Sequence, residues 1–387
     1  MHRSLNTMSL RIVHITPFYY PVIGGVERVV QRICEYLALL NYDVYVVTYN
    51  RTRKGNTNTM PFIEEVNGVK VIRLHPNITY SYGTYSTELP KVLERLRADI
   101  VHVHVWRHPH VIQVSKLKSK LRFKAILHMH DPFYLARQVG LKTYIYYHIM
   151  DKIFGKIIEN YDLVITLTPQ GKNLVGSKFR CYVNIMIIPP GIDDELLKKA
   201  MHFNNSNREQ FIVYIGRICR EKCIDLLIRA MPYVYKEIGM KMPCILIGPI
   251  DNRYYSKVAP LVRKLSVNAV FKGVVDEEIK FTYLSKAMAY VQPSLYEGFG
   301  ISLLEAQAFG TPCIVTGYGG QLYAAPPRIS SLWAYPDPES IAQCIIKLLT
   351  NYELWSDLSK QARLWASKHT WSRILPHYKT LYEALAS

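Results

Sequence analysis

The stretch PSLYEGFGISLLEAQAFGTP, residues 293–312, holds two glutamates eight positions apart around two glycines. The preceding apolar run predicts a strand, LYEGFG a turn and SLLEAQAFG a helix, so Glu297 falls in the loop and Glu305 about one turn into the helix. Gly298 and Gly300 allow close approach of the backbone to a ligand, and the helix start offers free amides to an anion. Carboxylates there would accept hydrogen bonds from hydroxyls. The arrangement suits a nucleotide sugar, and solvated glutamates on a loop and a helix are the alternative.

Apolar, β-branched runs recur between helical patterns along the 387 residues and predict parallel sheets flanked by helices. The runs are LRIVHIT, DVYVVT, VKVIRL, DIVHVHV, KAILHMH, DLVITLT and NIMIIP, then QFIVYIG, PCILIG, NAVFKG, AMAYVQP and PCIVT. The polar segment at 198–210 predicts a linker. We therefore expect two doubly wound α/β domains, with ligands bound at the carboxyl ends of their strands in the cleft between them. Residues 369–387 predict a final helix capped by Thr370 or Ser372.

A second constellation, IGRICREKCIDLLIRA at 215–230, follows the first strand of the second half and opens a helix. It brings Arg217, Arg220 and Lys222 to the helix entrance. Arginine can fork two phosphate oxygens and lysine adds a compact charge, so the group could neutralise a departing nucleoside diphosphate. A solvated helix entry is the alternative.

A third segment, HITPFYYPVIGGVERVVQRICEYL at 14–37, reads as strand, loop and helix with Gly24 and Gly25 at the helix start. The bared amides could hold a phosphate, although a plain turn would use the same pair. The segment is not a Rossmann fingerprint, and the sequence contains no Walker A motif.

Together these motifs resemble the retaining GT-B glycosyltransferases of glycosyltransferase family 4, over most of the chain. The resemblance is carried by PFYYPVIGGVERVV, HMHD, IIPPGID, GRICREKCIDLLI, LIGP, FKGVVDEE and the E-x7-E stretch quoted above. It implies two Rossmann-like domains facing a cleft: an acceptor-binding domain over 1–200 and a nucleotide-sugar-binding domain over 201–368. The helix over 369–387 would pack back on the first domain.

The resemblance also implies a role for each matching residue. Glu297 would hold donor-sugar hydroxyls, Glu305 the ribose hydroxyls, and Arg217 with Lys222 the diphosphate. His130 matches the family's cleft histidine, within reach of a sugar hydroxyl or the reacting centre; a histidine satisfied in the cleft wall is the alternative. The remaining donor contacts would be backbone groups at Gly24, Gly25, Gly298, Phe299, Gly300 and Ile301, with Val274 bordering the base. Catalysis would rest on Glu297, His130, Arg217 and Lys222, with retention of anomeric configuration.

Histidines and cysteines raise the question of a metal. His102 and His104 alternate on one strand face and are followed by His108 and His110, but carboxylate partners are missing. The seven cysteines are scattered, and the spacing of the Cys219 and Cys223 pair is no strong zinc signature. We expect reduced thiols, no metal, and no cofactor apart from the donor substrate.

Two positions depart from the family pattern. Cys223 stands where the family has glycine after the lysine, and Tyr323 stands where it has a glutamate after the Gly-Gly pair. The segment 320–336 is also shorter than usual. These changes border the expected donor site, so they bear on the identity of the sugar more than on the fold.

The chain has a formal net charge of +18, with the larger excess of basic residues before residue 200. Such a field attracts anionic substrates, acidic lipids or nucleic acid. Alternating lysines and arginine in KLKSKLRFK (116–124) and the aromatic, lysine-rich segment 133–158 could rest on an anionic bilayer or receive a lipid-linked acceptor; a solvated basic edge is equally consistent.

No apolar run reaches the roughly 18 residues of a spanning helix, and no signal peptide is evident. We expect a cytoplasmic protein, peripheral on the inner face of the cell membrane, with a glycan or lipid-linked acceptor. A sugar-nucleotide epimerase of the same architecture is the alternative enzyme. A nucleic-acid-binding protein is suggested by charge alone, because no recognition module for nucleic acid is present, and we expect no nucleic-acid partner.

Overall fold

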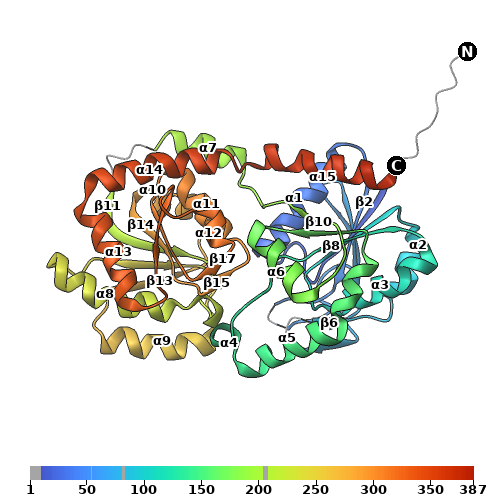
Figure 1. Cartoon of the computed structure of the whole chain (residues 1–387), viewed down its shortest axis with the longest axis horizontal. Coiled ribbons are helices and arrows are strands. Elements are labelled where there is room, and N and C mark those ends of the chain that lie inside the picture. Colours follow the sequence, from blue (N-terminus) through green and yellow to red (C-terminus); the bar gives the residue numbers. More distant parts are fainter. Residues whose placement is uncertain (1–9, 54, 81–82, 204–207) are drawn as a thin grey trace, which may run out of the picture. The chain divides into compact units, whose positions relative to one another are not determined.

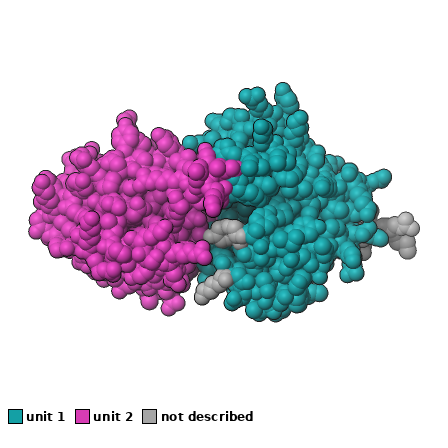
Figure 2. Space-filling view, turned by 90° about the horizontal axis from the view of Figure 1, so that it is seen from below, with its two compact units in different colours: residues 1–132, 146–188, 374–387 teal, residues 133–145, 189–373 magenta. Residues whose placement is uncertain are grey.

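A computed structural model describes residues 10–53, 55–80, 83–203 and 208–387. The chain divides into two compact units, coloured separately in Figure 2. Unit 1 comprises Met1–Pro132, Tyr146–Ile188 and Ile374–Ser387, and unit 2 comprises Phe133–Ile145 and Pro189–Arg373. Residues 133–145 and 189–200 lie before the expected boundary at residue 200 but belong to unit 2. Residues 369–373, expected with the final helix, also belong to unit 2.

Unit 1 is built on an eight-stranded sheet in the order β10-β9-β8-β7-β1-β2-β4-β3. Its strands are β1 Arg11–Ile15, β2 Asp43–Tyr49, β3 Ile63–Val66, β4 Val69–Leu74, β7 Ile100–His104, β8 Lys124–His128, β9 Leu163–Thr166 and β10 Ile185–Ile187. All neighbours pair in parallel except β3 and β4. The seven expected strands are confirmed. Sequence reasoning missed β3, whose IEEV sequence alternates in exposure and lies at the sheet edge, where charged residues discourage further pairing.

Helices accompany this sheet in the chain (Figure 1). They are α1 Gly25–Leu39, α2 Leu89–Leu96, α3 Pro109–Leu121, α6 Pro169–Phe179 and α15 Trp371–Ala386, with the 3-10 turn η1 Gly155–Asn160 and the hairpin of β5 Ile78–Tyr80 and β6 Gly83–Tyr85. Helix α4 Ala136–Val139 belongs to unit 2, and α5 runs over Leu141–Phe154. The expected final helix is confirmed as α15, and its residues from Ile374 onward belong to unit 1. Tyr378 and Tyr382 of α15 are fully buried there.

Unit 2 holds a six-stranded, wholly parallel sheet in the order β13-β12-β11-β14-β16-β18. Its strands are β11 Glu209–Ile215, β12 Cys244–Ile247, β13 Ala269–Gly273, β14 Ala287–Gln292, β16 Cys313–Thr316 and β18 Ser331–Ala334. The first five confirm the expected strands. Strand β18 was missed because its four residues, SLWA, do not form a longer apolar run. Ile212, Leu246 and Val291, from three neighbouring strands, are fully buried, as expected for a sheet covered on both faces.

The helices of unit 2 follow its strands in the usual alternation (Figure 1). Besides α4 they are α7 Asp194–Met201, α8 Ile224–Ile238, α9 Asn252–Lys264, α10 Glu277–Lys286, α11 Ile301–Ala308, α12 Gln321–Ala324, α13 Pro338–Thr350 and α14 Tyr352–Ser367. The expected linker at 198–210 is wrong at both ends: residues 198–201 close α7 and residues 209–210 open β11. Residues 204–207 of that segment lie outside the described residues. In the parts of the chain that the structure covers, we find no helix with the length and apolarity needed to span a bilayer.

Candidate active site

Glu297 lies beyond the carboxyl end of β14, in the two-residue strand β15, Tyr296–Glu297. The sequence predicted a loop here. Instead β15 pairs in parallel with β17, Tyr318–Gly319, and the amide of Gly320 donates to the Glu297 carbonyl at 2.7 Å. A Cβ atom on Gly319 or Gly320 would collide with the backbone of residues 297–299, and Gly319 has a φ of 96°. Glycine is therefore required opposite Glu297, and the short pairing fixes its backbone.

The Glu297 carboxylate is buried and ion-paired with Lys222 of the 3-10 turn η3, Arg220–Lys222. The Lys222 Nζ atom lies 2.6 Å from Oε1 and 2.7 Å from Oε2 of Glu297. Oε1 also accepts hydrogen bonds from Gln292 Nε2 at 2.9 Å and Ser294 Oγ at 2.5 Å. The structure thus brings together two residues that the sequence predicted in separate roles. The pair is costly to break, because Glu297 without Lys222 would be a buried charge that has lost its cation.

A polar network under this pair was missed by sequence reasoning. The Tyr290 hydroxyl lies 2.8 Å from both Gln292 Oε1 and Ser302 Oγ, and 2.9 Å from the Ile215 carbonyl. The Gln292 Nε2 group donates to Ser294 Oγ at 3.0 Å as well as to Glu297. The network connects the ends of β11 and β14 with the start of α11. Polar residues closing the apolar run AMAYVQPS were the available signal.

Gln138, fully buried in unit 2, was also missed. Its Nε2 group donates to the Glu221 carbonyl at 2.8 Å and to the Tyr296 carbonyl at 2.9 Å. Those carbonyls belong to the residues directly before Lys222 and Glu297. One side chain therefore ties together the two backbone segments that present the ion pair. No sequence pattern indicates such contacts, because they join positions 83 and 158 residues apart.

Glu305 lies one turn into α11, as predicted, and is buried. Lys280 of α10 donates to its Oε1 atom at 3.1 Å and also lies 3.6 Å from Glu277. Before α11, Gly298 and Gly300 flank the buried Phe299, and Gly300 has a φ of 98° where it caps the helix. The amides from Gly298 to Ile301 thus precede or open a helix, which is the arrangement that suits an anion.

The other predicted donor residues of unit 2 also follow strands. Arg217 lies two residues after the end of β11 and is partly buried, and its carbonyl accepts a hydrogen bond from the Tyr214 hydroxyl at 3.0 Å. Val274 follows β13 and is 67% exposed. Cys223 is buried with a φ of 53°, so this position requires the left-handed conformation that glycine adopts without strain. That geometry accounts for the family's preference for glycine.

Gly24, Gly25 and His130 belong to unit 1. Gly25 is the first residue of the 15-residue helix α1, which confirms the predicted helix start, and it is exposed. Gly24 is extended, and a Cβ atom there would meet Glu27 and Arg53, whose side chains pair at 2.5 Å. His130 and Asp131 follow β8 with φ values of 55° and 46°. Two consecutive non-glycine residues in this strained region often mark functional loops.

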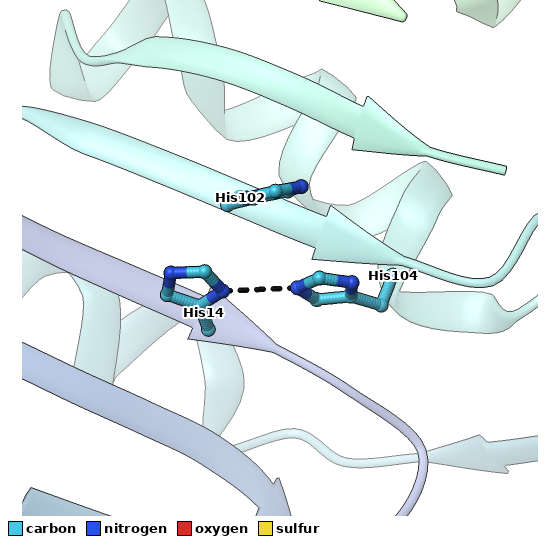
Figure 3. A group of neighbouring side chains, drawn as sticks. All are labelled: His14, His102 and His104. Atoms are coloured by element: carbon cyan, nitrogen blue, oxygen red, sulfur yellow. Dashed lines mark hydrogen bonds between the residues drawn. The ribbon is translucent and has the colours of Figure 1, made fainter. Parts of the chain in front are cut away.

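The four histidines weighed for a metal fall into two separate groups. His108 and His110 stack at 4.2 Å between ring centroids and lie against Tyr49. His102 and His104 instead meet His14 from the neighbouring strand β1 (Figure 3). Cys219 and Cys223 are buried, which raises the pKa of their thiols to about 12 and about 11. Within the described ranges, neither cysteine joins a group of three with metal-ligand spacing.

Unit 1 has a mostly parallel sheet and unit 2 a wholly parallel one, and the two glutamates in E-x7-E spacing follow β14, the first of them beside Lys222, an arrangement typical of a GT-B glycosyltransferase. Residues 23–196 match the model of "Glycosyltransferase Family 4" and residues 198–365 that of "Glycosyl transferases group 1". The chain belongs to this family of glycosyltransferases.

Individual relatives are similar to this chain over nearly its full length. The uncharacterized glycosyltransferase MJ1607 of Methanocaldococcus jannaschii is 25% identical over 97% of this chain and 98% of its own. Among solved structures, sucrose-phosphate synthase of Thermosynechococcus elongatus has a TM-score of 0.76 at 22% identity, over 97% of this chain and 99% of its own. HepE of Anabaena in complex with UDP-glucose has a TM-score of 0.75 at 14% identity, over 97% and 100%.

Proposed function

We propose that this glycosyltransferase moves a sugar from a nucleoside-diphosphate sugar to a hydroxyl acceptor with retention of anomeric configuration. The observation that carries the proposal is the Lys222–Glu297 ion pair, which lies directly before the amides that open α11. Gln292 of β14 donates a hydrogen bond to the Glu297 carboxylate, and Gln138 donates one to the neighbouring Tyr296 carbonyl. The UDP-glucose bound by HepE, which shares the fold, supports a donor of this class.

The site offers complementary groups to each part of such a donor. Arg217 and Lys222 would bind the diphosphate; two of the three Lys222 ammonium protons serve Glu297, and the third is available to a phosphate oxygen. Glu305 would accept hydrogen bonds from the ribose hydroxyls and Glu297 from the sugar hydroxyls. The Gly298–Ile301 amides would hold phosphate, and the exposed Val274 would border the base.

A front-face displacement assisted by the leaving diphosphate fits these residues best. Glu297 is neutralised by Lys222 and accepts two further hydrogen bonds, so its carboxylate is a weak nucleophile. As the bond from the anomeric carbon to the diphosphate oxygen breaks and the bond to the acceptor oxygen forms, the acceptor proton would pass to the leaving phosphate. Arg217 and Lys222 would stabilise the charge that develops there, without a metal ion.

For unit 1 we propose that the Gly25 amide contacts the sugar phosphate and that His130 gives a hydrogen bond to the sugar. Burial lowers the pKa of His130 to about 3, so the imidazole is neutral at physiological pH. A neutral imidazole can direct one N–H at a hydroxyl without adding charge to the site.

We further propose that the acceptor is lipid-linked or a glycan, and that the protein works in the cytoplasm on an anionic membrane. Helix α5 supports this: it exposes an apolar stripe at four-residue intervals. The stripe consists of Leu141 (67% exposed), Ile145 (48%), Ile149 (50%) and Ile153 (63%), and the helix also carries Lys142 and Lys152. By contrast, two lysines of the 116–124 run are already paired, Lys118 with Asp162 at 2.9 Å and Lys120 with Glu94 at 3.8 Å. Helix α5 is therefore the better candidate for contact with a bilayer.

Vesicle binding tests the membrane role. The wild-type protein should co-sediment with anionic liposomes at low salt, and I149E/I153E should reduce the bound fraction several-fold because it places two charges in the stripe. Lys120→Glu, on α3, is the control and should change binding little. Equal binding by I149E/I153E would contradict the role of α5.

A thermal-shift panel of nucleoside diphosphates and their sugars tests the donor. A ligand at 100 times its Kd should stabilise the protein by about 2.7 kcal/mol. Glu305→Ala should abolish the shift given by the best ligand. Glu277→Ala, which removes the more distant and exposed partner of the same Lys280, should preserve it. An unchanged shift in Glu305→Ala would refute the ribose contact.

A further inference from the structure

A row of hydrogen-bonded rings crosses the interior of unit 1 and ends at His130. His130 Nε2 lies 3.0 Å from His104 Nδ1, and His104 Nε2 lies 2.9 Å from His14 Nδ1. His14 Nε2 is 3.3 Å from the Tyr382 hydroxyl, which is 2.6 Å from His102 Nδ1. We call these five residues the imidazole chain. Figure 3 shows its middle, where His14 and His104 reach each other from adjacent strands.

Only one end of the imidazole chain, His130, is exposed to solvent. His14, His102, His104 and Tyr382 are fully buried, whereas His130 is partly exposed. Burial lowers the pKa of all four histidines, so each imidazole is neutral and carries a single N–H. With one proton per ring, every hydrogen bond in the chain must run in the same direction. The choice made at His102 therefore fixes which nitrogen of His130 carries the proton.

The buried end decides that direction. His102 Nε2 meets no hydrogen-bond partner in the described part of the chain. A buried N–H without an acceptor is costlier than a bare ring nitrogen, and such orphaned donors are rare in proteins. The His102 proton therefore sits on Nδ1 and is donated to the Tyr382 oxygen. Tyr382 then donates to His14, His14 to His104, and His104 to Nε2 of His130.

We propose that His102, Tyr382, His14 and His104 are positioning residues that hold His130 in the Nδ1–H tautomer, so that it serves as a hydrogen-bond donor to the substrate rather than as a base. The assignment of a substrate contact to His130 rests on the proposed function. The tautomer itself rests on the hydrogen-bonded chain alone.

The same histidines have spacing that could hold a metal ion, in the groups His14, His102, His104 and His104, His128, His130. Both groups contain histidines alone, so a divalent ion would bring its full charge into a buried region without a carboxylate or thiolate. Ligation would also compete with the bond between His14 and His104 in the first group and with the bond between His104 and His130 in the second. The hydrogen-bonded chain uses both ring nitrogens of His14 and His104, whereas His128 lies outside it and has no hydrogen-bond partner at either ring nitrogen among the described residues. We adopt the hydrogen-bonded arrangement because it needs no buried ionic charge.

His104→Leu removes the donor to Nε2 of His130 and is the disruptive variant of the test. Helix α15 supplies two further variants that should leave the direction of the hydrogen bonds unchanged. Tyr382→Phe removes the hydroxyl that joins His14 to His102, so His14 becomes the buried end, its Nε2 is bare and its proton stays on Nδ1. Tyr378→Phe removes a buried hydroxyl from the same helix, near the rings of His102 and His128, that has no hydrogen-bond partner among the residues described. Both α15 variants keep an aromatic ring in place, so they differ mainly in whether a hydroxyl of the imidazole chain is lost.

Two-bond ¹H–¹⁵N spectra of the full-length protein labelled in histidine report the tautomer directly, with His130→Asn to assign the resonance. We expect His130 as a neutral Nδ1–H ring in the wild type, in Tyr378→Phe and in Tyr382→Phe, and a mixture or an Nε2–H ring in His104→Leu, which removes the donor to Nε2 of His130. An Nε2–H ring in the wild type, or no change in His104→Leu, would overturn the proposal. About one bound metal ion per chain that is lost in His104→Leu would overturn it too, because His104 belongs to both groups.

Turnover separates this proposal from the proposed function. With a donor found by thermal shift, His104→Leu should lower kcat about 10-fold with the donor KM within about twofold, because the donor still binds but the N–H of His130 is no longer held in one direction. Tyr378→Phe should leave both unchanged. If the protein transferred no sugar at all, the proposed function would fail while the spectra still decided the tautomer.

Discussion

The ion-paired site of unit 2 and the imidazole chain of unit 1 present polar groups in opposite ways. In unit 2, opposite charges are buried together and each is satisfied by the other, as for Lys222 and Glu297. In unit 1, burial keeps the rings neutral, and order comes from the direction of hydrogen bonds. The first arrangement supplies charge to a ligand, and the second supplies one oriented donor.

The largest expected effect is in the ion pair. Lys222→Met leaves the buried Glu297 carboxylate without its cation, so we expect a loss of about 3 kcal/mol in the free energy of unfolding and a fall in kcat of about 10³-fold. Chemical denaturation and steady-state transfer measure the two. Replacing the exposed Lys272 with methionine is the control and should change neither.

The double variant Lys222→Met, Glu297→Gln sharpens this result. It removes both charges, so most of the stability should return while activity stays lost. If the double variant were no more stable than Lys222→Met, the pair would not be the source of the loss.

A smaller effect is expected at Gln138. Gln138→Leu leaves the carbonyls of Glu221 and Tyr296 without their donor, so we expect a loss of about 2 kcal/mol in stability and a fall of about 10-fold in kcat/KM as the ion pair shifts. Gln113→Leu removes one hydrogen bond to the Ser86 carbonyl in unit 1 and should leave kcat/KM unchanged. Equal kinetics for the two variants would show that Gln138 does not position the site.

The smallest effect is expected in the pH dependence of the free energy of unfolding, which the buried neutral histidines of unit 1 should produce. Burial holds the pKa of His128 well below 6.5, so below pH 6.5 the unfolded chain binds one proton more at this position than the folded chain. The free energy of unfolding therefore falls as pH falls, by about 1.4 kcal/mol per pH unit for each such histidine. His128→Leu should make the loss between pH 6.5 and 5 shallower by that amount.

Denaturation at several pH values checks this slope. The exposed His75 gives the control, because His75→Asn should leave the slope as in the wild type. A slope unaffected by His128→Leu would mean that the folded chain protonates His128 as readily as the unfolded one.

The sequence predicted those strands and site positions that depend on a local pattern of residues. The apolar runs gave twelve strands of the two sheets, and the E-x7-E spacing placed Glu305 in the first turns of α11. It did not predict the pairing of β15 with β17, because two-residue strands have no periodicity. Gln138 and Tyr382 were missed for a different reason. Their partners are 83 to 368 residues away, and nothing near them in sequence marks the contact.

The order of segments in unit 1 has a consequence for biosynthesis. Tyr382 arrives on α15, after the whole of Pro189–Arg373 has been made. A ribosome therefore releases the first 188 residues long before the phenol that closes the interior between His14 and His102 exists. Most of unit 2 is synthesised in that interval, whereas unit 1 is completed only by the last helix.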